Sequence, residues 1–175
     1  MASFNFPLGI SRHDPHFERI RQIIETFQGY ETLGDLKAAD EQVRKYLARQ
    51  LQKTADESKD ARRKIEAGMH LRVLPDFDAM TLHIQADRDV LQDHVKDRIV
   101  ACQAYRPAAD PIRELYAMDY KILSGAENAY NLMQEFARIA REDLLIANIH
   151  KIELSLRDIA ECMEKRGKTI DCMLR

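Results

Sequence analysis

The chain has 175 residues, of which 45% are apolar and 32% charged, with a formal net charge of -2 at pH 7. This apolar content excludes a disordered tail and is enough to build one sizeable core. The nearly balanced charge argues against a general nucleic-acid or membrane binder, because such proteins carry a clear basic excess.

Turn-forming residues are scarce, with 6 glycines and 5 prolines in the whole chain. A composition rich instead in Ala, Leu, Arg, Glu, Lys and Asp is typical of long helices. We therefore predict an all-α fold: an elongated, mostly antiparallel helical bundle of four to five helices, with coiled-coil-like long helices. Residues 14–175 are expected to form this single domain. Residues 1–13 alternate apolar groups around a proline and a glycine, which predicts an extended N-terminal segment.

The sequence favours a cytoplasmic protein. Cys102, Cys162 and Cys172 are odd in number and have no CxxC spacing, which indicates free thiols in a reducing compartment. The N-terminus lacks the basic and apolar regions of a secretory signal. No run of residues approaches the ~18 apolar positions that a bilayer-spanning helix needs. We expect neither a membrane nor a nucleic-acid partner.

Two Asp-Pro pairs predict helix starts, because aspartate caps free backbone N–H groups and proline needs none in the first turn. Asp14 and Pro15 open a helix that is expected to end at Gly29. Asp110 and Pro111 open the last third of the chain in the same way.

Two further helices are predicted between these starts. The first runs from residue 32 to about residue 68, through a polar middle at 50–64 that contains no helix breaker. A connector at 70–78 follows. The next helix is expected to begin at a cap formed by Asp76 or Asp78 and to continue to about residue 104.

The last third of the chain carries two apolar stripes at near-heptad spacing, each of which lines one side of a helix. The first covers residues 112–140 and has one polar position, Asp119. The second consists of Leu145, Ile149, Ile152, Leu156, Ile159 and Met163. Because its register differs from that of the first, we predict that this stripe is the protein interface of a homodimer. Gly167 is expected to end the helix, and the spacing leaves open whether residues 124–125 and 141–144 are turns.

His83, Asp87 and His94 fall on one face of a predicted helix, at i, i+4 and i+11. Two imidazoles and a carboxylate could ligate a metal, so a bundle that binds a metal or small ligand is one alternative. The spacing is looser than the i,i+4 pair of an HExxH site, and the three positions flank the apolar stripe, where solvated polar residues are expected. We therefore predict no metal and no cofactor.

The sequence contains no glycine-rich phosphate loop, no GxSxG and no nucleophile beside a base. The leading prediction is a non-enzymatic helical interaction module: a scaffold, adaptor or regulatory subunit that acts through self-association and contacts with another protein. A histidine phosphotransfer protein is the second alternative, with His70 or His94 accepting phosphate, although neither histidine has the neighbours that such sites use.

Overall fold

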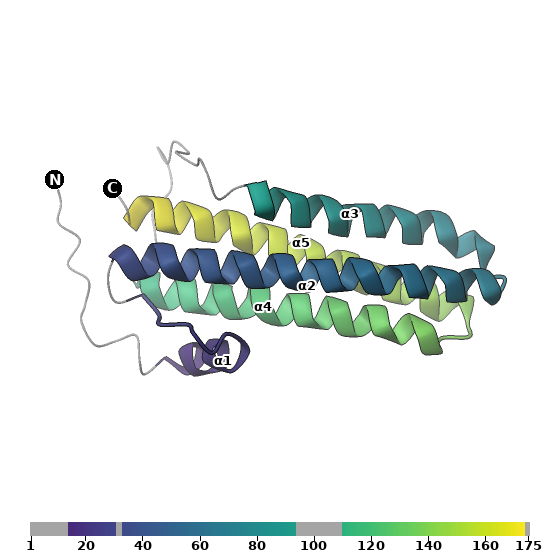
Figure 1. The fold of residues 1–175 in the computed structure, drawn as a ribbon, viewed down its shortest axis with the longest axis horizontal. Coiled ribbons are helices and arrows are strands. Elements are labelled where there is room, and N and C mark those ends of the chain that lie inside the picture. Colours follow the sequence, from purple (N-terminus) through teal and green to yellow (C-terminus); the bar gives the residue numbers. More distant parts are fainter. Residues whose placement is uncertain (1–13, 31–32, 94–109, 174–175) are drawn as a thin grey trace.

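Four long helices lie side by side in the computed structural model, and a short helix packs against one end of them (Figure 1). The structure describes residues 14–30, 33–93 and 110–173, and within these residues it contains helices and turns but no strand. The predicted all-α fold is confirmed. The elements are α1 (Pro15–Ile23), α2 (Leu33–Ala67), α3 (Leu74–Asp93), α4 (Pro111–Glu135) and α5 (Glu142–Met173), with 3₁₀ turns at Leu71–Val73 and Phe136–Arg138. The extended segment predicted for residues 1–13 lies outside the described residues.

Side-chain contacts show how the helices run relative to one another. Arg62 of α2 donates from Nε to Oδ1 of Asp78 on α3 at 2.9 Å, and Arg88 of α3 donates to Gln52 of α2 at 2.7 Å. These two contacts make α2 and α3 antiparallel. α4 and α5 are also antiparallel, because Asn128 of α4 contacts Ser155 of α5 and Glu114 of α4 contacts Lys165 of α5. α3 also contacts α5, and α1 packs on α4.

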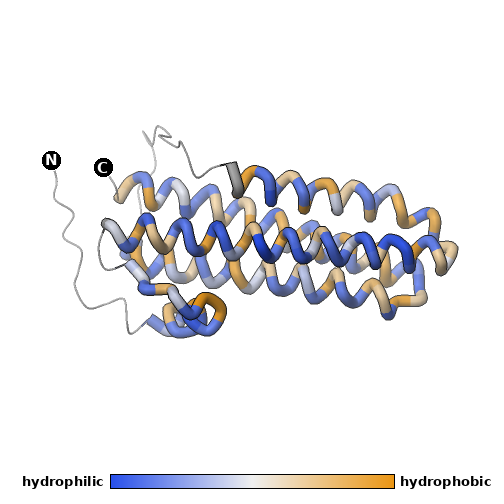
Figure 2. Tube along the Cα trace, viewed as in Figure 1, coloured by the Kyte–Doolittle hydropathy of each residue, from blue (hydrophilic) through white to orange (hydrophobic). Residues whose placement is uncertain are grey.

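Each helix turns one apolar side toward a common core, and Figure 2 shows hydrophobic positions recurring along every helix. The polar stretch at 50–64 remains helical, as predicted, because α2 turns small residues inward there. Thr54, Ala55, Ser58 and Ala61 are at most 3% exposed. The Thr54 hydroxyl donates to the carbonyl of residue 50, and the Ser58 hydroxyl donates to that of Ala55, so both buried hydroxyls have acceptors.

Both predicted Asp-Pro helix starts are confirmed. The Asp14 carboxylate accepts the backbone N–H of His16 at 2.8 Å, and the Asp110 carboxylate accepts that of Arg113 at 3.0 Å. α4 continues through Gly125, so residues 124–125 are not a turn. The connection between the last two helices lies at residues 136–141, just before the predicted register change at 141–144.

Two predicted boundaries near the N-terminal half are wrong. α1 ends at Ile23 instead of reaching Gly29, because Ile24 is extended and the chain turns at residues 25–26 before the glycine. α3 begins at Leu74, ahead of the cap expected at Asp76 or Asp78. The proline that follows Leu74 falls in the first turn, where its missing N–H breaks no hydrogen bond. The predicted part of this helix beyond residue 93 lies outside the described residues.

The predicted end of the last helix at Gly167 is also wrong, since α5 continues to Met173. A glycine in a helix interior costs only about 1 kcal/mol. Burial of Thr169, Ile170 and Met173 beyond it offsets that cost. α5 is therefore nearly two turns longer than the sequence pattern suggested.

Candidate functional site

A network of buried charged and hydroxyl groups lies where α2, α4 and α5 meet the loop after α1. Asp119 on α4, Arg166 on α5 and Tyr30 in the loop are all 0% exposed. Arg166 donates from Nε to Asp119 and from Nη1 to Asp40 of α2, and the Tyr30 hydroxyl donates to the second oxygen of Asp119. Arg166 Nη2 also donates to the Tyr30 hydroxyl, at 3.1 Å. One guanidinium thus joins three helices and a loop.

Aromatic packing fixes the loop that carries Tyr30. Gly29 adopts φ +87°, and a Cβ at this position would lie 2.5 Å from the Tyr116 hydroxyl and 3.1 Å from the Phe17 ring. The backbone N–H of Tyr30 donates to the Tyr116 hydroxyl at 3.1 Å, and the two rings are 5.0 Å apart. Phe17 and Phe27 pack edge-on against Tyr116. The tight turn and this cluster together place the Tyr30 hydroxyl beside Asp119.

Burial and neighbouring charges act in opposite directions on the network. Burial raises the pKa of the Asp119 carboxyl, and the positive charge of Arg166 offsets only part of that rise. Burial also opposes ionisation of Asp40, but there the charges of Arg166 and Arg44 outweigh it and lower the pKa. Burial disfavours the charged form of Arg166, yet Asp119, Tyr30 and Asp40 hold its pKa above the ordinary value. The centre of the network is therefore a permanently charged guanidinium.

The network is not accessible to a substrate, because its central groups are buried and bonded to one another. Such groups position helices rather than react. Arg44 of α2 connects the network to the surface: its Nε donates to Asp40 at 2.9 Å, and its side chain lines a surface hollow.

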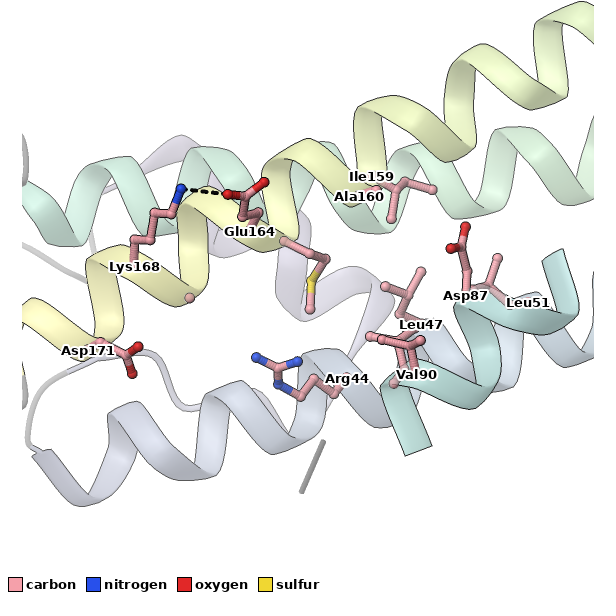
Figure 3. Close-up of a pocket in the computed structure, with 13 residues that line it drawn as sticks. Arg44, Leu47, Leu51, Asp87, Val90, Ile159, Ala160, Glu164, Lys168 and Asp171 are labelled. Atoms are coloured by element: carbon pink, nitrogen blue, oxygen red, sulfur yellow. Dashed lines mark hydrogen bonds and ion pairs between the residues drawn. The ribbon is translucent and has the colours of Figure 1, made fainter. Parts of the chain in front are cut away.

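This hollow, of about 410 Å³, lies between α2, α3 and α5 (Figure 3), and we call it the groove. Its floor is apolar and comes from all three helices: Leu47, Leu51, Val90, Leu91, Ile159 and Met163. Two of its residues, Ala160 and Gly167, are small and leave the α5 backbone open to close approach. The groove could therefore receive an apolar surface of another molecule.

Charged side chains of both signs frame the groove. The Arg44 guanidinium points toward it from α2, and Lys168 pairs with Glu164 along α5 at 2.5 Å (Figure 3). Asp87 of α3 stands at the other side, where burial raises the pKa of its carboxyl and the charge of His83 opposes the rise. An apolar floor within a charged rim is the usual anatomy of a protein contact surface.

The structure brings together two of the three residues considered for a metal. His83 and Asp87 line a second hollow of about 320 Å³ between α3 and α5, whereas His94 lies outside the described residues. Within the described ranges, no group of three His, Cys, Asp or Glu side chains is arranged to hold a metal ion. His70, one of the two phosphate-acceptor candidates, lies at the opposite end of α3, with Nδ1 4.0 Å from a carboxylate oxygen of Glu142.

The stripe predicted as a dimer interface lies in the chain's own core. Leu145, Ile149, Ile152, Leu156 and Ile159 are between 0 and 6% exposed, and Met163 is partly buried in the groove. The register changes because α5 begins as a new helix after residues 136–141 and packs back along α4. These side chains are already covered within one chain, so their assignment to an interface between two copies is corrected.

Arg166 was not predicted to be a core residue, because Gly167 was expected to end the helix. A signal was nonetheless present. When the alternating four- and three-residue steps of the α5 stripe are continued past Met163, they reach Arg166, Ile170 and Met173, all of which are buried. Asp119 occupies the same kind of position in α4. Opposite charges at core positions of two helices predict a buried ion pair, because neither charge is tolerated there alone.

Comparisons with known proteins do not assign a function. No family model matches the chain, and neither the curated proteins nor the solved structures contain a significant match. In the part of the chain that the structure describes, every helix is too short or too polar to cross a membrane.

Proposed function

We propose that the protein is a non-enzymatic helical interaction module, a scaffold, adaptor or regulatory subunit, and that a partner protein docks in the groove. The observation that carries this proposal is the groove itself, whose apolar floor opens to solvent. Val90 is 51% exposed there, and Met163 lies beside it. Methionine adapts to varied surfaces, and grooves of this kind receive the apolar face of a helix in many complexes.

The buried network supports this proposal because it holds the walls of the groove in place. Arg166 ties α5 to α2 through Asp40, and the same carboxylate binds Arg44 at the groove wall. A surface that is ordered before binding loses less conformational entropy when a partner arrives. The polar groups of the interior are in this view the support for a contact surface.

The homodimer remains a separate prediction, since the α5 stripe does not provide its interface. Exposed apolar side chains elsewhere on α3 and α5, such as Leu82 and Leu154, are available to other contacts. Equilibrium sedimentation at tens of micromolar measures the mass directly, and a mass of one chain throughout would remove the homodimer.

Site-specific photo-cross-linking in the cells that produce the protein tests the proposed function. A photoreactive phenylalanine analogue replaces Val90, and the control replaces Leu71, which is 53% exposed and lies in the 3₁₀ turn before α3, about 30 Å away. We expect an adduct of one defined mass from position 90 and none from position 71. Equal adducts from the two positions, or none from either, would overturn the proposal.

A further inference from the structure

We infer that the N-terminal arm, residues 14–30, controls the order of the groove wall at Arg44. With the arm docked on α4 the wall is held in place, and when the arm is released the wall loosens. Arg166 and Asp40 connect the two sites. This inference rests on the proposed function, and it names how the contact surface of that function is regulated.

The arm is attached mainly to one helix of the bundle. Among the described residues, α1 packs extensively on α4 and on no other helix (Figure 1). A short element with one main packing partner can open as a unit while the rest of the molecule stays folded. The arm therefore has a docked and a released state, and release uncovers its buried apolar side chains: Phe17, Ile20, Ile24, Phe27 and Tyr30.

The Tyr30 hydroxyl lies between two groups that would otherwise bind each other. It donates to Oδ2 of Asp119 and accepts from Nη2 of Arg166 at 3.1 Å. Arg166 Nε already donates to Oδ1 of the same carboxylate. Nε and Nη2 share one edge of the guanidinium, and a carboxylate that accepts from both forms the strong bidentate pair of arginine. The docked arm therefore keeps the pair of Arg166 and Asp119 from closing.

Closure of that pair changes the third bond of Arg166. Nη1 donates to Oδ1 of Asp40 in the docked state. Because the guanidinium is planar and turns as one body, moving Nη2 onto Asp119 draws Nη1 away from Asp40. Asp40 then keeps Arg44, whose Nε donates to its Oδ2 at 2.9 Å, but it is no longer held from the interior. Arg44 lines the groove, so the wall loses its fixed position.

The coupling acts in both directions, as thermodynamic linkage requires. A molecule that binds the groove and orders Arg44 also favours the native bonds of Asp40 and Arg166, and these bonds leave room for the Tyr30 hydroxyl. Binding in the groove thus favours the docked arm. None of the described residues that line the groove belongs to the arm, so the effect passes through the buried network.

NMR spectra of the full chain test the first direction. The Met163 methyl group, labelled with ¹³C, reports on the groove, and the Nε–H signal of Arg44 reports on its bond to Asp40. Tyr30→Phe removes the hydroxyl and keeps the ring. We expect it to shift the Met163 methyl signal and to speed hydrogen exchange at Arg44 Nε–H about five-fold or more.

Tyr46→Phe is the matched control. Tyr46 belongs to α2, next to Leu47 of the groove floor, and its hydroxyl donates to Glu127 at 2.8 Å, outside the network. This variant also loses one bond between a tyrosine and a carboxylate, but it should leave the signals of Met163 and Arg44 unchanged. Circular dichroism confirms that both variants are folded.

Asp40→Asn tests the reverse direction. Loss of the charge frees Arg166 to close on Asp119 and to displace the Tyr30 hydroxyl, which weakens docking of the arm. Amide hydrogens of α1 should then exchange about five-fold or more faster relative to those of α4. Glu41→Gln is the control at the neighbouring position, because Glu41 pairs with exposed Lys45 at 2.5 Å, and it should leave this ratio unchanged.

Two results would overturn the inference: effects of Tyr30→Phe on the Met163 and Arg44 signals no larger than those of Tyr46→Phe, or an exchange ratio that Asp40→Asn leaves unchanged. Neither measurement needs a partner, so the two proposals fail separately. If the coupling is absent but position 90 captures a partner, the interaction module stands without this regulation. If the coupling is measured but position 90 captures nothing, the proposed function fails and the arm still controls the groove.

Discussion

Arg166→Met removes the guanidinium that joins three helices and leaves an apolar side chain of similar length. The two carboxyl groups remain, Asp119 at 0% exposure and Asp40 at 26%. Removing one partner of a buried ion pair leaves an uncompensated charge and costs about 3–5 kcal/mol. Asp119 can escape this penalty only by binding a proton, which itself costs free energy at neutral pH. We therefore expect the free energy of unfolding to fall by about 3–5 kcal/mol, a large share of the usual 5–15 kcal/mol.

Urea titration followed by circular dichroism measures this loss, with the slope of the transition unchanged. Lys121→Met is the control, because Lys121 of α4 is 57% exposed and forms an ion pair at 3.5 Å with Asp158 of α5, which is 59% exposed. Its loss should be at most about 1 kcal/mol, as for other exposed ion pairs. Adding Asp119→Leu to Arg166→Met should recover stability, since an apolar pair can replace a buried ionic one. A loss for Arg166→Met no larger than that of the control would refute this reasoning.

Three other predictions concern the backbone and the pH dependence of the fold. Met69→Gly should raise the free energy of unfolding by about 1 kcal/mol, because Met69 has φ +59° and glycine adopts this conformation freely; calorimetry should show a higher Tm. Gly29→Ala should lower stability by about 1–3 kcal/mol, since its Cβ would meet the Tyr116 hydroxyl and its φ is +87°; an unchanged urea midpoint would contradict this. The folded pKa of Asp40 is lowered, so its contribution to stability is complete above the unfolded pKa and is lost as pH falls through the folded pKa. Asp40→Asn should therefore have a lower free energy of unfolding than the unchanged protein at pH 7, and the difference should shrink in acid. Urea titrations at several pH values measure this difference, and a difference that stays constant with pH would contradict the prediction.

The helices themselves were largely predictable because their signals are local. The caps at Asp14 and Asp110 depend on neighbouring residues alone, and both are confirmed. The polar middle of α2 was predicted as helix because it lacks a breaker, and its inward positions are small, so the apolar pattern weakens there without ending the helix. The helix end predicted at Gly167 was wrong. Glycine is favoured just after a helix end, but burial of residues further along the chain stabilises the longer helix.

The candidate site was less predictable because it depends on contacts between helices. The groove lies between α2, α3 and α5, and the apolar stripe of a single helix does not encode the distance between two helices. Asp40 offers no signal of its own, since a polar residue at the flank of an apolar stripe is usually solvated. Its role becomes visible only when Arg166 is brought beside it. The dimer assignment of the α5 stripe failed for the same reason: spacing reveals an apolar side but not which surface covers it.

The bond between Arg166 and Asp119 also selects one alignment of α4 and α5 among several that their apolar stripes would permit. Sliding α5 along α4 by one repeat of the pattern would still bring apolar side chains together over most of the contact. It would, however, place Arg166 level with Ile112 or Ala126, both of which are buried in the native arrangement. Each charge would then be buried without a partner, so the misaligned arrangement of α4 and α5 is not stable enough to compete with the native one during folding.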